Sequence, residues 1–487
     1  MKMNNETQTS PSSNSVDMTE GNIPDALFFV GAGGIGMTNL ERYYLSKGSA
    51  VGGYDRTPSA LTLEMEKEGA RIIYDDDPTL IGEEFRDPEK TLVVYTPAVP
   101  TDNRILTFFR NGGFKVVKRA ALLGLVTRHT DAICVAGSHG KTTTSSMVAN
   151  VLRRSKQGCN AFLGGILRNV GSNLVLTQGS PFSVIEADEY DRSFHHLSPF
   201  IAIITSTDPD HLDIYGNEEN YLESFAHFTS LIRPGGLLLV HTGLKLVPRT
   251  QPGVRVLTYS AHDGGDWHAE DITYGEGTLS FTLAGPEDLR IKDIKLGAPV
   301  GINVDNAVAA AAAAIEAGAT EEDIRLGLGD FMGAKRRFEI WMDGKGGTPV
   351  LIDDYAHSPN EVKASIASVK KLYPGRKLCV IFQPHLYTRT RDFADEFAEA
   401  LSGADRVIMP EIYPARELPI PGVDTSIILD KVKSGEKCYC ERKDLLNLIK
   451  NSNFEILMTL GAADIDRLLP DIKQILEKSG ECAHSEK

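Results

Sequence analysis

The sequence predicts an α/β protein made of three consecutive domains. Hydrophobic runs of strand length alternate with amphipathic stretches along most of the chain, and this alternation starts afresh near residues 26, 132 and 338. Such alternation is typical of parallel sheets whose strands are joined by crossover helices. In the first two series the opening strand runs directly into a glycine-rich loop.

Length and composition limit the possible functions. A chain of 487 residues is too long for one core, and 41% hydrophobic with 24% charged residues is ordinary for a globular protein. The formal charge of -15 argues against a nucleic-acid partner, because phosphate neutralisation needs clustered Lys and Arg. The alanine run at 307–314 is too short to span a bilayer, so we expect no membrane partner and a cytoplasmic location.

The N-terminus and the cysteines carry little functional signal. Residues 1–22 are polar and lack the apolar segment of a signal peptide, so we expect a disordered tail. The six Cys are scattered, and only Cys438 and Cys440 lie close together. Without a second pair or a His cluster they predict reduced thiols rather than a structural zinc site.

The elements follow from the hydrophobic runs. In the first domain, predicted at 23–128, the expected strands are ALFFV, AVGGY, RIIY, TLVVY and FKVV. In the second, predicted at 129–335, they are AICVAG, FSVIEA, FIAIITS and GGLLLVH, followed by short strands near 254–297 that look antiparallel and by an alanine-rich helix. In the third, predicted at 336–487, they are PVLIDDY, KLCVIFQ, DRVIMP and FEILMTL.

The first glycine-rich loop has the G-x-G-x-x-G spacing of a dinucleotide fingerprint. Gly31, Gly33 and Gly36 carry it, and Asp55 stands at the end of the next strand, where a ribose-binding carboxylate would lie. Taken alone, this loop suggests an NAD-dependent oxidoreductase.

The second loop predicts a phosphate site. It lies between a buried strand and an amphipathic helix and consists of Gly137, Ser138, His139, Gly140, Lys141, Thr142 and Thr143. Backbone N–H groups and the helix N-terminus would face the anion, Lys141 would reach the terminal phosphates, and the Thr142 hydroxyl would ligate Mg²⁺. The generic phosphate loop has glycine at position 135, where this chain has Val, so an incidental turn is the alternative.

The two loops have to be explained together. An oxidoreductase has little use for the second, and a regulator that only binds nucleotides would not need its Lys for turnover. An ATP-driven enzyme with a nucleotide-linked substrate uses both, because the first loop then holds the substrate's diphosphate by the same helix-terminus physics.

At this point the chain resembles the Mur ligases of peptidoglycan synthesis. The agreeing segments, in order, are GAGGIGM, GSHGKTTT, EADEYDRSFHHLSP, DPDHLDIYG, GAKRRFE, DDYAHSPNEV, FQPHLYTRTRDF, PIPGV and LGAADI. They cover about residues 26 to 475. Their common order and spacing make the resemblance specific.

The resemblance implies an N-terminal Rossmann-like domain for the UDP part, a central mixed-sheet ATPase-like domain for ATP, and a C-terminal Rossmann-like domain for the amino acid. Within the family the chain is most similar to the ligases that join L-alanine to UDP-N-acetylmuramate with ATP and Mg²⁺ through an acyl phosphate. The alternative is a recycling ligase that adds a tripeptide. We expect a monomer or a homodimer.

The family pattern assigns the residues around ATP. Lys141 acts in catalysis, Asn306 contacts adenine, and Arg337 of the basic triplet contacts phosphate, although such a triplet is usually a solvated face. Ile302 stands where the family often has His. Asn303 could equally be the N-cap of the alanine-rich helix.

The metal is assigned to Thr142, Glu186 and His211, with His211 also catalytic. The alternative for Glu186 is a solvated acidic loop. His195 and His196 are expected to be surface or packing residues.

The amino-acid site is assigned to Tyr355, His357 and Arg389. A guanidinium fork suits the free carboxylate, and His357 and Arg389 are expected to act in catalysis. A second family Arg is Leu386 here. Asp353 and Asp354 end a strand and would suit a ribose or a substrate amine.

In the first domain Gly33, Ile35 and Gly36 are expected to contact the diphosphate. Asp55 is expected to bind the uridine, and a helix N-cap is the alternative for this residue.

Overall fold

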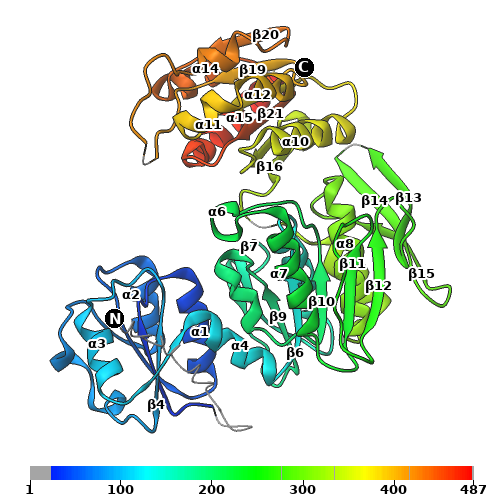
Figure 1. Cartoon of the computed structure of the whole chain (residues 1–487). Coiled ribbons are helices and arrows are strands. Elements are labelled where there is room, and N and C mark those ends of the chain that lie inside the picture. The colour runs from blue at the N-terminus through cyan, green and yellow to red at the C-terminus, as the bar shows by residue number, and fades with distance from the viewer. Residues whose placement is uncertain (1–22, 276, 334, 416, 485–487) are drawn as a thin grey trace, which may run out of the picture. The chain divides into compact units, whose positions relative to one another are not determined.

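The structure is a computed structural model that describes residues 23–275, 277–333, 335–415 and 417–484. The chain divides into two compact units, with the boundary between His129 and Thr130. The predicted α/β fold with three sheets is confirmed (Figure 1). The predicted tail, 1–22, lies outside the described residues, and the limits of the three domains stay a prediction.

The first unit contains a five-stranded parallel sheet in the order β3-β2-β1-β4-β5. Its main elements are β1 (Ala26–Val30), α1 (Ile35–Ser46), β2 (Ala50–Tyr54), α2 (Ala60–Glu68), β3 (Arg71–Ile73), β4 (Thr91–Tyr95), α3 (Arg104–Asn111), β5 (Lys115–Lys118) and α4 (Arg119–Arg128). Every residue of β1 is buried, as expected for a central parallel strand covered on both faces. The five strands predicted for this domain are confirmed.

The strand order reverses at β1, and the first glycine loop begins at this switch point. Gly31 follows β1 directly and has a φ of 93°, in the left-handed region. A Cβ at this position would come within 2.6 Å of the Thr96 methyl group and 3.1 Å of a Val99 methyl group, both just after β4. Glycine therefore lets the chain turn close to its neighbour at the crevice where open α/β sheets bind ligands.

The second unit begins with a ten-stranded mixed sheet in the order β15-β14-β13-β12-β11-β10-β6-β9-β7-β8. Its strands are β6 (Asp131–Ala136), β7 (Asn160–Leu167), β8 (Ser172–Val175), β9 (Phe182–Glu186), β10 (Ile201–Ile204), β11 (Leu237–His241), β12 (Arg255–Ser260), β13 (Trp267–Gly275), β14 (Thr278–Ala284) and β15 (Arg290–Lys295). Its helices are α5 (Lys141–Leu152), α6 (Leu212–Tyr215), α7 (Glu218–Ser230), α8 (Ile302–Glu316) and α9 (Glu321–Gly329).

The structure corrects the predicted pairing in this sheet. Of the strands expected to be antiparallel near 254–297, β12 pairs in parallel with β11 and with the start of β13. Of these strands, β13, β14 and β15 pair antiparallel. The hairpin of β7 and β8 was not predicted, because two glycines and few β-branched residues weaken its strand pattern.

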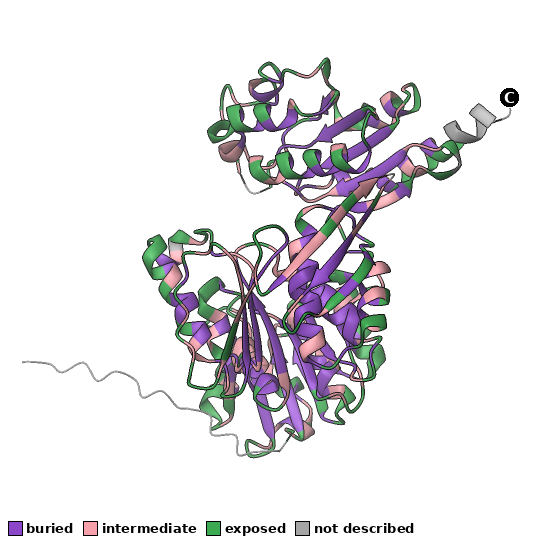
Figure 2. Ribbon diagram, turned by 90° about the vertical axis from the view of Figure 1, so that its right-hand side faces the viewer, coloured by how far each residue is buried: buried purple, intermediate pink, exposed green. Residues whose placement is uncertain are grey.

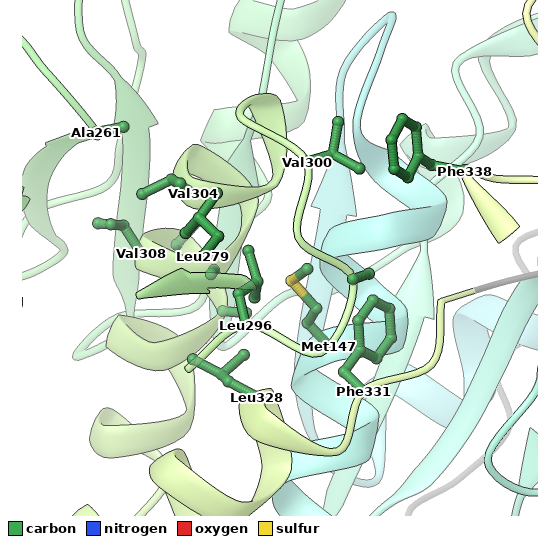
Figure 3. Packing of buried hydrophobic residues seen from close by; sticks show 14 of the residues in the cluster. Met147, Ala261, Leu279, Leu296, Val300, Val304, Val308, Leu328, Phe331 and Phe338 are labelled. Atoms are coloured by element: carbon green, nitrogen blue, oxygen red, sulfur yellow. The ribbon is translucent and has the colours of Figure 1, made fainter. Parts of the chain in front are cut away.

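The alanine-rich helix α8 lies in the main core. All of its alanines are buried, and their small side chains allow close packing between α8 and α5. Figure 3 shows Val304 and Val308 of α8 in the same cluster as Met147 of α5 and Leu328. The helix that carries the second glycine loop is thus fixed from behind by a dense apolar layer.

The C-terminal part of the second unit holds a six-stranded sheet in the order β16-β17-β21-β18-β19-β20. Its strands are β16 (Glu339–Asp343), β17 (Val350–Asp354), β18 (Leu378–Phe382), β19 (Arg406–Met409), β20 (Glu436–Tyr439) and β21 (Ile456–Leu460). Its helices are α10 (Pro359–Leu372), α11 (Tyr387–Asp392), α12 (Ala394–Leu401), α13 (Ser426–Leu429), α14 (Leu445–Lys450) and α15 (Leu469–His484). The four predicted strands are confirmed; the edge strands β16 and β20 were missed.

Burial follows this layering. Figure 2 shows buried strands between helices whose outer faces are exposed. Only β16 is antiparallel to its neighbour, so β17, β21 and β18 end at one edge of their sheet. Within the described part of the chain, no helix combines the length and the apolarity that a membrane span requires.

Candidate active site

The second glycine loop has the geometry of an anion cradle. It leaves β6 at Gly137 and enters α5 at Gly140, and both glycines have left-handed φ values of 141° and 84°. A Cβ on Gly140 would lie 2.8 Å from Oδ1 of Asn306. No side chain caps α5, so the N–H groups of its first turn remain open to an anion.

The loop is held from the side by the segment that follows β10. The Ser138 hydroxyl donates to the Asp208 carbonyl at 2.5 Å and lies 2.8 Å from the Tyr221 hydroxyl. The His139 N–H donates to the Ser206 hydroxyl at 2.7 Å. The His139 ring is more than half exposed and lies 3.8 Å from the Asp208 carboxylate. Ser138 and His139 thus fix the loop to the adjacent strand end.

Lys141 forms a largely buried ion pair. Its Nζ donates to Oε1 of Glu189 at 2.8 Å and to the Gly137 carbonyl at 2.5 Å. The Glu189 side chain is 1% exposed. The sequence placed Lys141 correctly on the first turn of the helix, but it gave no role to Glu189.

Thr142 and Glu186 bring hard oxygen ligands together beside the loop. The Thr142 hydroxyl donates to Oε1 of Glu186 at 3.0 Å, and the Gly164 N–H donates to Oε2 at 2.8 Å. Burial raises the pKa of the Glu186 carboxyl, while the bonds from Gly164 and Thr142 and the charge of Lys141 act in the opposite direction. A desolvated carboxylate beside a threonine hydroxyl is a donor set that Mg²⁺ fits. The alternative of a solvated acidic loop is therefore wrong for Glu186.

His211 lies near Glu189. It has a φ of 52°, and its Nε2 is 4.0 Å from Oε1 of Glu189 and 3.8 Å from Oδ2 of Asp210. Among the described residues, no three His, Cys, Asp or Glu side chains form a group able to hold a metal ion. A metal shared by Glu186 and His211 stays a prediction.

Asn306 is bonded to α5, the helix that follows the second glycine loop. Its Oδ1 accepts from the Thr144 hydroxyl at 3.0 Å, and its Nδ2 donates to Asn303 at 3.1 Å. Helix α8 starts at Ile302 with Gly301 as its N-cap, so the N-cap alternative for Asn303 is wrong. Ile302 is 60% exposed. Adenine contact by Asn306 stays a prediction.

A second cluster lies where β17 and β18 end. His357 follows β17, and its Nδ1 donates to the Tyr355 carbonyl at 3.1 Å, which leaves Nε2 as the basic nitrogen. Burial lowers the pKa of the His357 imidazole, although the nearby Glu361 charge opposes this. The Tyr355 ring stands edge-on to it, with the ring centroids 5.2 Å apart.

Arg389 and His385 follow β18 and have unused hydrogen-bonding atoms. Nη1 of Arg389 and Nδ1 of His385 are buried without a hydrogen-bond partner among the described residues. Leu386, at the start of α11, has a left-handed φ of 71°. The orphaned guanidinium nitrogen indicates an anionic ligand here.

Of the basic triplet, Arg336 is a structural anchor. It donates to the Gly461 carbonyl at 2.5 Å, to the Ala463 carbonyl at 2.8 Å and to Asp353 at 3.3 Å. Asp353 is fully buried and also accepts from Thr459, so the expectation that it serves a substrate is wrong. Arg337 is exposed and lies 6.0 Å from the Tyr355 ring, and its phosphate contact stays a prediction.

The first loop, in the first unit, is organised by Asp55. The Gly33 N–H donates to Oδ2 of Asp55 at 2.7 Å, and α2 is capped by Ser59, so the N-cap alternative for Asp55 is wrong. A Cβ on Gly36 would lie 2.9 Å from an Arg119 guanidinium nitrogen, which places a cation at this loop. The N–H groups of Ile35 and Gly36 lie in the uncapped first turn of α1.

Comparisons with known proteins agree with this geometry. Three family models match successive parts of the chain: the Mur ligase family catalytic domain at 27–130, the Mur ligase middle domain at 135–314 and the Mur ligase glutamate ligase domain at 336–454. The UDP-N-acetylmuramate–L-alanine ligase of Parabacteroides distasonis is 55% identical over 453 residues, which is 93% of this chain and 97% of that protein. This chain belongs to the Mur ligase family.

Further relatives of this Mur ligase point the same way. The UDP-N-acetylmuramate–L-alanine ligase of Phocaeicola vulgatus is 52% identical over 93% of the chain and 98% of that protein. Among solved structures, the UDP-N-acetylmuramate–alanine ligase MurC of Thermotoga maritima has 27% identity and a TM-score of 0.70, covering 95% of this chain and all of that one. A murein peptide ligase from Psychrobacter arcticus, at 21% identity and a TM-score of 0.57, shows the shared fold.

The Mur ligase is therefore a ligase that forms C–N bonds, as its sequence predicted. Sequence reasoning found the two loops, because glycine spacing and strand ends are visible in the sequence. It gave no role to Glu189, His385 or Arg119. Each is recognised only in the structure. Glu189 pairs with the largely buried Lys141, and His385 has a buried Nδ1 without a hydrogen-bond partner among the described residues. Arg119 occupies the space that a side chain on Gly36 would need.

Proposed function

We propose that this Mur ligase joins L-alanine to the lactyl carboxylate of UDP-N-acetylmuramate and cleaves ATP to ADP and phosphate. The observation that carries the proposal is the open helix terminus of α5 with Lys141 and the Thr142–Glu186 oxygen pair beside it. The named activity of the relatives at 55% and 52% identity supports the choice of substrates.

The first step activates an unreactive carboxylate. A lactyl oxygen attacks the γ-phosphorus, the bond to the bridging oxygen breaks, and ADP leaves, which forms an acyl phosphate. Such a transfer depends on positioning and on charge neutralisation. The first-turn N–H groups, with Gly137, Ser138, His139, Gly140 and Thr143 around them, would bind the triphosphate. The Lys141 ammonium would follow the charge on the transferred group, and Asn306 and Arg337 would complete the ATP site.

Mg²⁺ is the metal that this oxygen set would hold. Thr142 and Glu186 supply the ligands, and His211 is proposed to act nearby on the same charged groups. When bound, the ion would neutralise phosphate charge. The hydrogen bond from the Gly164 N–H would orient the Glu186 carboxylate toward the ion.

The second step forms the amide. The Arg389 guanidinium would grip the carboxylate of L-alanine with its unused buried nitrogen, and Tyr355 would line the site. The alanine nitrogen attacks the acyl carbon, the tetrahedral oxyanion collapses, and phosphate leaves with the former carboxylate oxygen. His357 would take the proton from the amine through Nε2, because its Nδ1 is committed to the Tyr355 carbonyl.

The UDP part belongs to the first unit. The first turn of α1, with Gly33, Ile35 and Gly36, would bind the diphosphate, and Arg119 adds a cation. Because Oδ2 of Asp55 holds the Gly33 N–H, only its other oxygen is proposed to serve the uridine. ATP and nucleotide sugars are cytoplasmic metabolites, which supports a cytoplasmic enzyme. We propose a monomer or a homodimer.

One assay tests the proposal against the recycling alternative. The purified chain is given ATP, Mg²⁺ and UDP-N-acetylmuramate with either L-alanine or the tripeptide L-alanyl-γ-D-glutamyl-meso-diaminopimelate. Phosphate release and a UDP-sugar heavier by one alanyl residue are expected with L-alanine. Release with the tripeptide alone would overturn the proposal.

A further inference from the structure

We infer that Glu189 is a positioning residue that aims the Lys141 ammonium for phosphoryl transfer. The inference rests on the proposed function and goes beyond it. Glu189 lies three residues after β9, directly before the 3-10 helix at Tyr190–His196, and its side chain is 1% exposed. Both of its oxygens face Lys141, with Nζ 2.8 Å from Oε1 and 2.8 Å from Oε2.

The ion pair fixes where the ammonium points. Nζ of Lys141 also donates to the Gly137 carbonyl at 2.5 Å, and its side chain is only 15% exposed. A lysine stem has four rotatable bonds, so a free ammonium would follow whichever anion lies nearest. Two acceptors follow the adjacent ends of neighbouring parallel strands, Gly137 after β6 and Glu189 after β9. Together they restrict the position of Nζ beside the loop.

The backbone around Glu189 is itself fixed. The Glu189 carbonyl accepts from the Tyr215 hydroxyl at 2.5 Å and from the Arg192 N–H at 3.0 Å. Asp191 and Arg192 have left-handed φ values of 51° and 55°, a conformation that non-glycine residues keep only where surrounding contacts hold it. The carboxylate is thus presented from a rigid turn.

Glu189 also lies close to His211. Its Oε1 lies 4.0 Å from Nε2 of His211, so one carboxylate is close to both the lysine and the histidine proposed to act on the same phosphate. When a triphosphate binds, its charge competes with Glu189 for the ammonium. We expect this competition to keep Lys141 from settling on the ground-state phosphates and to leave it placed for the charge that develops during transfer.

The test is Glu189→Gln, which keeps the shape and removes the charge. Turnover with ATP, UDP-N-acetylmuramate and L-alanine is expected to fall about 10- to 100-fold, as for other residues that orient a catalytic group. Affinity for a non-hydrolysable ATP analogue with Mg²⁺, measured by calorimetry, is expected to stay equal or to rise, because the site loses a negative charge. A merely structural Glu189 would instead weaken binding when it is lost. Weaker binding by tenfold or more, or turnover equal to that of the unmodified chain, overturns the inference.

The matched control is Asp188→Asn. Asp188 is the neighbouring residue on the same loop. It is exposed, and its carboxylate accepts a hydrogen bond from the Tyr190 N–H at 3.1 Å. Loss of the same charge there is expected to leave turnover near that of the unmodified chain. An equal loss in both variants would mean that turnover depends on the net charge of this loop and not on the orientation of the Lys141 ammonium. That result would overturn the inference.

A second measurement needs no turnover. Lys141→Met leaves Glu189 buried without its partner and is expected to lower the melting temperature, and adding Glu189→Gln is expected to restore most of it. Additive effects would contradict the coupling. If the unmodified chain releases no phosphate with L-alanine, the proposed function fails, whereas the calorimetric and melting results still decide whether Glu189 governs Lys141.

Discussion

Arg389 offers the most direct test of the proposed amino-acid site. Its guanidinium carries a buried nitrogen without a partner, so its removal should be felt by the carboxylate of L-alanine. Arg389→Ala is expected to raise KM for L-alanine about 10- to 100-fold, the equivalent of one lost charge-assisted bond. Initial rates over a range of L-alanine concentrations measure this.

Arg391→Ala serves as the control on the same helix. Arg391 is 52% exposed and pairs with its neighbour Asp392, so its loss should leave KM for L-alanine unchanged. If the two variants behave alike, Arg389 does not hold the carboxylate.

His357 predicts the pH dependence of amide formation. Burial is the larger cause and lowers the pKa of this imidazole from 6.5, so the basic Nε2 is unprotonated at neutral pH. The rate should therefore stay level through pH 7 and fall only below pH 6.5, as the ring gains its proton. A pH profile of kcat with saturating substrates should show this acid limb, and His357→Gln should remove it. A limb that persists unchanged in the variant would exclude His357 as the base.

At the scale of residues, sequence reasoning found groups that sit at fixed places in motifs. Lys141, Thr142 and Glu186 were placed by the loop and by the end of a strand, and the structure brings them together. Asp353 was misjudged because a carboxylate at a strand end reads the same whether it faces a ligand or the interior. Only the Arg336 guanidinium and the Thr459 hydroxyl, distant in sequence, reveal that it is an internal partner.

At the scale of elements, the alanines of α8 set how closely two helices approach. Ala310 is fully buried, in the core that backs the phosphate loop. Ala310→Leu is expected to lower the free energy of unfolding by about 1–3 kcal/mol, because extra methylene groups in a packed core force neighbours off their preferred rotamers. Chemical denaturation measures the change.

The control is Ala367→Leu on α10, where the same side chain is added at an exposed position. It should alter stability by less than about 0.5 kcal/mol. A similar loss in both variants would show that the leucine itself, not crowding of α8, is harmful.

Asp353, in β17 of the last sheet, predicts how stability depends on pH. Burial raises the pKa of Asp353 to about 6 from 3.8, against the opposing bonds from Thr459 and Arg336. A carboxyl with a raised pKa binds its proton more tightly in the folded chain, so this group adds stability as the pH falls from about 6 toward 3.8. As the pH falls over this range, the melting temperature of the unmodified chain should therefore rise relative to that of Asp353→Asn. A constant difference between the two would contradict the account.

Most of the elements were predictable because buried parallel strands read as unbroken hydrophobic runs. The exceptions have physical reasons. The strands β16 and β20 lie at sheet edges, where half-exposed residues blur the pattern, and β7 contains two adjacent glycines. The pairing direction predicted for β12 was wrong, because the sequence of a short strand does not show which neighbour the strand will join.

At the scale of the whole molecule, the chain has two uncapped helix termini that we propose bind anions, and one cluster that we propose binds an amino acid. The termini are the first turns of α1 and α5, and the cluster follows β17 and β18. An enzyme that only hydrolysed ATP would need α5 alone. We expect phosphate release to require all three substrates together, because the acyl phosphate forms from ATP and UDP-N-acetylmuramate and is consumed by L-alanine.

The central claim is that the sugar carboxylate is activated by taking phosphate from ATP. The most direct measurement uses UDP-N-acetylmuramate labelled with oxygen-18 in the lactyl carboxylate, with ATP, Mg²⁺ and L-alanine, and mass analysis of the released phosphate. The account predicts one labelled oxygen in each phosphate, because the carboxylate oxygen leaves with it. Phosphate that is released in step with the alanyl product but carries no label would contradict it.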